Sequence, residues 1–153
     1  MKVIGIAFSD LHLGEYSKFN EDNKRTLNHI RVLYLIKDLC IKYKCPAFFC
    51  GDFMHRPEFI STSLDEIIIE QFEELNRYEE FNIYGISGNH CMPKANTIEH
   101  RSPSHWANLC RRYSFLHNID FSYHDFGKFR VVGIPYIDHN NGLDGLIKSE
   151  LKG

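Results

Sequence analysis

Residues 46–52 read Pro-Ala-Phe-Phe-Cys-Gly-Asp, and this stretch decides the fold class. Pro46 ends the helical periodicity that precedes it, and residues 47–50 form an apolar run too short for a helix. Such a run is typical of a strand that is buried on both faces, as in a parallel sheet. The polar pair Gly51-Asp52 then stands at the carboxyl end of this strand.

The same pattern, an apolar run followed by a polar turn, occurs once before and once after this stretch. We expect a buried strand over residues 3–9 that ends at Asp10, and another over residues 82–87 that ends at Gly88-Asn89-His90. Apolar residues at helical spacing predict a helix of about residues 23–43 between the first two strands. Its inner face would carry Leu27, Ile30, Leu33, Ile36, Cys40 and Tyr43.

Further elements continue this alternation. A second helix, with its N-cap among Ser61-Thr62-Ser63, would lead to the strand over residues 82–87. The spacing then predicts a helix over residues 105–113 and short strands at 115–117, 121–124 and 129–134, the last two joined as a hairpin. Strand, helix, strand, helix, strand is the order of βαβ units, so we expect an α/β fold whose first half is largely parallel.

The composition agrees with one globular domain. Of the 153 residues, 43 % are apolar and 25 % are charged, which is close to the average of soluble proteins. No apolar run reaches the roughly 18 residues of a membrane span, and five cysteines without a C-x-x-C pair favour reduced thiols in the cytoplasm. A net charge of −2 gives no overall basic surface, so contact with nucleic acid would need a local patch.

Candidate ligands follow all three early strands. Asp10 and His12 follow the first strand, Asp52 follows the second and Asn89 follows the third. Because ligands of α/β sheets bind at the carboxyl ends of the strands, we expect these turns to converge. Each turn alone carries little signal, but together they offer oxygen and nitrogen ligands that suit Mn²⁺, Fe or Zn²⁺ better than Ca²⁺. An Asp that bridges two metals about 3.5–4 Å apart would build a site for in-line displacement at phosphorus.

Three blocks of the sequence carry a family resemblance: Ser9-Asp10-Leu11-His12-Leu13-Gly14, Cys50-Gly51-Asp52-Phe53 and Ser87-Gly88-Asn89-His90. They resemble the first three signature blocks of the calcineurin-like metallophosphoesterases. With Met54-His55 and Ile134-Pro135-Tyr136, the chain is most similar to the SbcD-type DNA nuclease subunits, including those of tailed bacteriophages. The resemblance implies a metallophosphoesterase-type β-sandwich flanked by helices, in the cytoplasm of a bacterial or phage-infected cell.

The resemblance also implies roles for individual residues. Asp10 and His12 would bind a first metal, Asp52 would bridge both metals, and Asn89 would bind the second. His90 would be catalytic, stabilising transition-state charge or protonating the leaving oxygen. For His55 two interpretations stay open: a residue that approaches the substrate, or a loop histidine without a metal role. Members of this family use two divalent ions, usually Mn²⁺, to activate a hydroxide that attacks phosphorus. They cleave DNA as exonucleases and endonucleases, form homodimers and work with an SbcC-type ATPase subunit.

Two departures from the family pattern affect this expectation. Cys91 stands where the third block usually has the carboxylate that supports His90, and we interpret it as a small residue at a turn. The family pattern also continues, after the Ile-Pro-Tyr strand, with a His and a Gly-His-x-His block that this sequence lacks. We therefore expect residues 1–153 to be a metallophosphoesterase domain truncated before its last metal-binding blocks, with weak affinity for the second metal.

Other features leave alternatives open. A solvated helix face is the safer interpretation of the basic residues Lys18, Lys24, Arg25 and Arg31, which would otherwise contact phosphates. We interpret Trp106 as a packing residue rather than one that stacks on DNA, and Cys40, Cys45 and Cys50 as core residues. The remaining histidines, unlike those of the three blocks, are expected at the surface or at the edge of the core: His100, His105, His117, His124 and His139.

The three blocks alone do not choose a substrate. A general phosphomonoesterase or phosphodiesterase on the same fold is therefore the alternative to a DNA nuclease. A non-catalytic fragment that serves as a dimerisation module is a third interpretation, because some expected metal ligands are missing.

Overall fold

The computed structural model describes residues 2–14, 24–55, 61–91 and 104–137. Four parallel strands form one sheet in the order β1 (Ile6–Phe8), β2 (Ala47–Phe49), β3 (Ile83–Gly85) and β4 (Leu116–Asn118). Three helices accompany them: α1 (Lys24–Tyr43), α2 (Thr62–Leu75) and α3 (His105–Arg112). The predicted α/β class with a parallel first half is therefore confirmed, and β4 extends the parallel pairing to a fourth strand.

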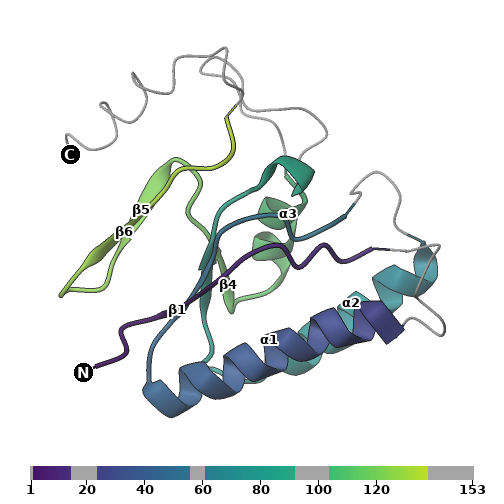
Figure 1. Cartoon of the computed structure of the whole chain (residues 1–153), viewed down its shortest axis with the longest axis horizontal. Coiled ribbons are helices and arrows are strands. Elements are labelled where there is room, and N and C mark those ends of the chain that lie inside the picture. The colour runs from purple at the N-terminus through teal and green to yellow at the C-terminus, as the bar shows by residue number, and fades with distance from the viewer. Residues whose placement is uncertain (1, 15–23, 56–60, 92–103, 138–153) are drawn as a thin grey trace.

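The two faces of the sheet carry different layers. Phe49 of β2 is buried in the core that the helices cover, whereas the neighbouring Phe48 faces the other way and meets Phe126, with ring centroids 5.8 Å apart. On that second face lies an antiparallel hairpin of β5 (Ser122–Asp125) and β6 (Arg130–Gly133). Figure 1 shows α1 and α2 on one side of the sheet and the hairpin on the other. The hairpin predicted from the sequence is confirmed.

Aromatic side chains make up the centre of the helix-covered core. Between ring centroids, Phe49 lies 4.8 Å from Trp106 and 5.9 Å from Phe53. The ring centroids of Phe53 and Phe72 are 5.6 Å apart. Trp106 is only 1 % exposed, so it has no surface on which a DNA base could stack. The interpretation of Trp106 as a packing residue is confirmed.

Serine caps fix the starts of two helices. Ser61 accepts the backbone N–H of Leu64 at 3.2 Å at the start of α2, as the sequence predicted. Ser104 accepts the N–H of Ala107 at 2.9 Å at the start of α3. These caps orient the helices that carry Phe72 and Trp106 into the core.

The inner face of α1 differs from the predicted one. Thr26 is fully buried and donates a hydrogen bond of 3.0 Å to the carbonyl of Gly14, which turns the adjacent Leu27 outward. Leu27 is 36 % exposed and Tyr43, the last residue of the helix, is 41 % exposed. Assigning Leu27 and Tyr43 to the inner face was therefore wrong, because apolar spacing does not reveal a buried threonine.

The strands β1, β2 and β3 are shorter than predicted. Residues 3–5 lie outside β1, since pairing with β2 begins at Ile6, whose N–H donates to the carbonyl of Pro46 at 3.1 Å. Cys40 and Cys45 are buried as predicted, but Cys50 is exposed because it follows the buried Phe49 in the alternation of the strand. Within the described part of the chain, no helix has the length and apolar character needed to cross a membrane.

Half-buried histidines link the stability of this fold to pH. Burial lowers the pKa of His105 and of His117, so the unfolded chain binds protons that the folded chain does not. Their contribution to stability is therefore full above the unfolded pKa of about 6.5 and is lost as the pH falls below it. We expect the free energy of unfolding, measured by urea denaturation, to be lower at pH 5.5 than at pH 7.5. His105→Gln should flatten this dependence, and an unchanged slope would contradict the assignment.

Candidate metal centre

The loops that follow β1 and β2 are joined by backbone hydrogen bonds that continue the pairing of the strands. Beyond β1, the N–H of Asp10 donates to the carbonyl of Gly51 at 3.0 Å, and the N–H of His12 donates to the carbonyl of Asp52 at 3.0 Å. The N–H of Leu13 donates to the carbonyl of Phe53 at 2.8 Å. The two loops therefore run side by side, and residues far apart in the sequence become neighbours.

Three residues in these loops adopt the left-handed backbone conformation. The φ angles are 59° at Asp10, 43° at His12 and 63° at Asp52, and Gly51 has φ 107°. For residues other than glycine, this conformation costs about 1–3 kcal/mol each and persists only where the surroundings enforce it. Backbone strain of this kind gathers at functional sites, and the three predicted ligands are three of the five non-glycine residues with positive φ in the described part of the chain, the others being Lys44 and Phe121.

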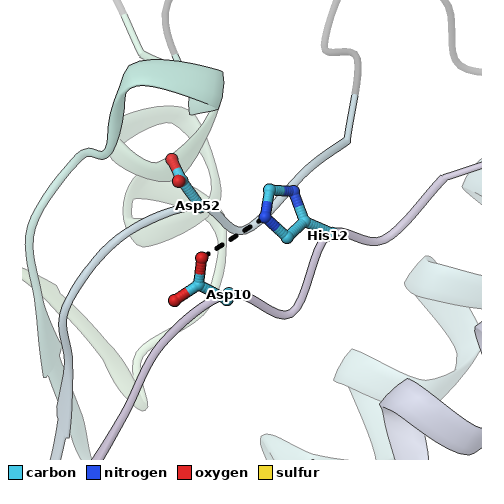
Figure 2. Close-up of side chains that lie close together, drawn as sticks. All are labelled: Asp10, His12 and Asp52. Carbon is cyan, nitrogen blue, oxygen red and sulfur yellow. Dashed lines mark ion pairs between the residues drawn. The ribbon is translucent and has the colours of Figure 1, made fainter.

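The side chains of these three residues converge. One potential ligand atom from each of Asp10, His12 and Asp52 lies within 4.8 Å of the others, and we call this group the candidate metal centre. The Nε2 atom of His12 is 3.4 Å from Oδ1 of Asp10. Figure 2 shows the Asp10 and His12 side chains, from the loop after β1, directed toward Asp52, from the loop after β2. The prediction that the turns carrying these three residues converge is therefore confirmed.

The charge of Asp10 favours a ligand role. Its carboxylate accepts a hydrogen bond from the Ser9 hydroxyl, which lowers the pKa of Asp10. The nearby His12 and His90 lower this pKa further, while burial acts in the opposite direction. Asp10 is exposed, whereas His12 and Asp52 are half-buried, so the group is open to solvent on the Asp10 side.

Two glycines allow a third loop to approach this centre. A Cβ atom on Gly51 would lie 2.9 Å from the Cα of Gly88, and a Cβ on Gly88 would lie 2.1 Å from Oδ1 and 2.4 Å from the backbone N of Asp52. Any side chain at Gly88 would therefore displace Asp52. The absence of a Cβ at both positions brings the loop after β3 against the loop after β2.

This third loop carries Asn89 and His90 in the short 3-10 helix η2 (Asn89–Cys91). The backbone N–H of His90 donates to Oδ1 of Asp52 at 3.1 Å. The imidazole of His90 is exposed, and its ring centroid lies 5.0 Å from that of His12. Asn89 is exposed and follows Gly88 directly. The predicted site residue His90 is therefore adjacent to the candidate metal centre. Asn89 belongs to the same loop, directly before His90.

A small hollow of about 220 Å³ adjoins the candidate metal centre. Its lining is formed by His12, Arg25, His55 and His90. The rings of His55 and His90 are nearly parallel, with centroids 6.3 Å apart. Three imidazoles and a guanidinium next to two carboxylates form a setting in which a phosphate group can meet both positive charge and proton donors. Of the basic residues interpreted as a solvated helix face, Lys24, Arg25 and Arg31 are exposed, and Lys18 lies outside the described residues.

Cys91 is a buried structural residue. Its side chain is 0 % exposed, and its Sγ accepts the backbone N–H of Phe53 at 3.3 Å. Burial raises the pKa of the Cys91 thiol, which keeps it protonated and unreactive. The interpretation of Cys91 as a small residue at a turn agrees with this environment.

Asp120 supports the third loop, a role that the sequence did not reveal. Its carboxylate accepts the backbone N–H of Ser87 at 2.8 Å and the Ser87 hydroxyl at 2.6 Å. The Ser87 hydroxyl is also hydrogen-bonded to that of Ser104, 2.7 Å away, at the start of α3. An aspartate in a short segment between two strands is indistinguishable from a surface turn residue, so no pattern pointed to it.

Among the other described histidines, His29 is near the centre, since its charge interacts with that of His12, whereas His105, His117 and His124 pack elsewhere. His105 stacks on Phe53 at the start of α3, and His117 and His124 surround Tyr84 on the hairpin side of the sheet. All three have intermediate exposure, which agrees with the predicted position at the edge of the core. His100 and His139 lie outside the described residues.

Neither protein-family models nor curated proteins match this chain. The chemistry of the centre must therefore follow from its own residues. Carboxylate oxygens with an imidazole nitrogen form a donor set for Mn²⁺, Fe or Zn²⁺, and the described part of the centre contains no thiolate.

The contact between Gly88 and Asp52 is open to a direct test. We expect Gly88→Ala to reduce the free energy of unfolding by about 1–3 kcal/mol, as overpacking does, and to weaken Mn²⁺ binding because Asp52 must shift.

Gly127 has φ 77°, and a Cβ atom added there would meet no atom within 4 Å. Gly127→Ala is therefore the matched control, with a strain cost of about 1–2 kcal/mol. Titration calorimetry should show Mn²⁺ binding retained in Gly127→Ala. Equal Mn²⁺ affinity in both variants would contradict the role of Gly88.

Proposed function

We propose that this protein is a metal-dependent phosphoesterase, most specifically a DNA nuclease subunit of the SbcD type among the calcineurin-like metallophosphoesterases. The observation that carries the proposal is the convergence of Asp10, His12 and Asp52 on strained turns at the carboxyl ends of neighbouring parallel strands. The order of these residues and their places after the strands match the blocks on which the family resemblance rests. The α/β sheet with a hairpin on its second face is compatible with half of a metallophosphoesterase β-sandwich.

In this proposal the centre would hold two divalent ions that share one carboxylate. Asp10 and His12 would hold the first ion, Asp52 would contact both, and Asn89 would supply an amide oxygen to the second. When bound, such ions supply a nucleophile at neutral pH and polarise the phosphoryl group. Mn²⁺ is the proposed metal, and Fe or Zn²⁺ would suit the same oxygen and nitrogen ligands.

The surrounding residues then act on the phosphate. Arg25 offers charged hydrogen bonds to the non-bridging phosphate oxygens, which orients the substrate in the hollow that it lines. His90 is the catalytic residue that transfers a proton to the leaving oxygen, because its exposed imidazole lies beside the centre while its backbone is anchored to Asp52. His55, across the hollow from His90, would contact the substrate on the same side.

The proposed biological context follows from the same resemblance. DNA would be the substrate, an SbcC-type ATPase would be the partner subunit, and the nuclease subunit would form a homodimer. The open position of the centre is compatible with a polymeric substrate, since Asp10, Asn89 and His90 are all exposed.

Metal binding tests the first step of this proposal. We expect the wild-type chain to bind Mn²⁺. In Asp52→Asn the affinity for Mn²⁺ should fall at least about tenfold, because removing even a residue that only supports a metal ligand typically costs that much. Asp125→Asn, which removes an exposed carboxylate from the hairpin turn, is the matched control and should bind Mn²⁺ as the wild type does. Titration calorimetry provides the affinities. Equal affinities in all three proteins would reject the centre.

Cleavage of linear duplex DNA in the presence of Mn²⁺ tests the second step. We expect His90→Gln to keep its Mn²⁺ affinity but to lower the cleavage rate about 10²–10⁴-fold, the usual contribution of general acid catalysis. Asp52→Asn should abolish cleavage. Gel analysis of end-labelled DNA gives the rates, and p-nitrophenyl phosphate serves as the second substrate.

The outcomes separate the alternatives. Hydrolysis of p-nitrophenyl phosphate without cleavage of DNA would favour a general phosphoesterase over a nuclease. Mn²⁺ binding without hydrolysis of either substrate would contradict the enzymatic proposal and favour a non-catalytic module.

A further inference from the structure

A second hollow of about 480 Å³ lies at the edge of the sheet, between α3, β4 and β5. Because β4 is the last strand of the four-stranded sheet, one of its edges has no neighbouring strand among the described residues. The polar lining of this edge hollow consists of Arg111, His117, Asn118, Ser122, Tyr123 and His124. None of these residues belongs to the candidate metal centre.

The described lining of the edge hollow has hydrogen-bond donors and no carboxylate. The guanidinium of Arg111 carries five N–H donors, and its hydrogen bond within the described structure, 3.4 Å long, goes to the neutral Oδ1 of Asn108. The two nearest acidic side chains along the chain have partners of their own: Asp120 is hydrogen-bonded to Ser87, although, besides burial, its charge raises the pKa of Cys110 in the lining, and Asp125 is paired with Arg130. A polar hollow whose lining holds a cation and no carboxylate is complementary to an anion.

The two imidazoles are held in place around Tyr84. The ring of His117 lies 4.4 Å and the ring of His124 lies 4.3 Å from the ring of Tyr84, and Nε2 of His117 is hydrogen-bonded to Oδ1 of Asn82 at 2.8 Å. Burial, together with the proximity of His124, lowers the pKa of His117. An anion bound in the hollow that both imidazoles line would act in the opposite direction, by favouring their charged forms.

We propose that the edge hollow binds a phosphate group, held by Arg111 together with His117 and His124. Guanidinium and imidazolium groups form charge-assisted hydrogen bonds with phosphate oxygens, and the hydroxyls of Ser122 and Tyr123 add neutral donors. The phosphate can be free or part of a nucleotide. The guanidinium of Arg130 lies over the Tyr123 ring, 4.3 Å from its centroid, but Tyr123 is still 55 % exposed, so part of its aromatic surface is available for a base.

Nuclear magnetic resonance of the full chain, in the presence of a chelator that removes divalent metal ions, tests this site. Inorganic phosphate is titrated first and a short oligothymidylate second. We expect saturable shifts of the Arg111, His117 and His124 signals, and a loss of affinity of about tenfold in Arg111→Gln, as for the removal of one charged hydrogen bond. His124→Gln should weaken binding in the same direction.

The neighbouring Arg112 provides the matched control. Its guanidinium lies over the ring of Tyr113, 5.4 Å from the centroid, and is not part of the lining of the hollow. Arg112→Gln should therefore leave the affinity for phosphate unchanged. Equal losses in Arg111→Gln and Arg112→Gln would show nonspecific attraction to the basic end of α3 and would overturn the proposal.

The two titrations distinguish the sources of the phosphate. Shifts at the same residues with both probes, at lower concentrations of oligothymidylate and with the Tyr123 ring included, would support a nucleic-acid strand as the source. Shifts with inorganic phosphate alone would support a free phosphate or a small phosphate ester. Shifts confined to His12 and His90, or no saturable shift, would overturn the edge site without bearing on the metal-dependent activity.

Discussion

Backbone hydrogen bonds between the loop after β1 and the loop after β2 hold the candidate metal centre together. Through them, Asp10 pairs with Gly51 and His12 pairs with Asp52, so the residues that carry the ligands are fixed by main-chain bonds before any metal is considered. The strain of the left-handed backbone is sustained by this pairing. Since the side chains are directed by the backbone, the site is preorganised, which is what selective metal binding requires.

The remaining layers hold this pairing in place. Gly88 packs against Asp52, Asp120 holds the backbone next to Gly88 through Ser87, and the helix-covered core behind β2 and β3 prevents the loops from separating. On the other face of the sheet, the hairpin places His124 over Tyr84. The same fold thus presents two groups of polar residues, one with carboxylates at the strand ends and one with cationic and neutral donors at the sheet edge.

Much of this architecture could be predicted from the sequence, because buried strands and amphipathic helices have distinct periodicities. The three candidate ligands Asp10, His12 and Asp52 could be predicted from the sequence because each closely follows an apolar run. Contacts between residues that are far apart in the sequence could not be predicted. Asp120 looks like a turn residue until its bond to Ser87 is seen. Thr26 replaces Leu27 on the inner face of α1 only because the carbonyl of Gly14 lies within reach, and the edge hollow exists only where three elements meet.

Anomalous diffraction at the manganese absorption edge, from crystals of the full chain grown with Mn²⁺, tests the central claim most directly. If the proposed function holds, an anomalous peak is expected between Asp10, His12 and Asp52, whose potential ligand atoms lie within 4.8 Å of one another. In crystals of Asp52→Asn, this peak should be lost or strongly weakened. Anomalous density located elsewhere, or an ordered centre that holds no manganese, would contradict the assignment of these residues as metal ligands.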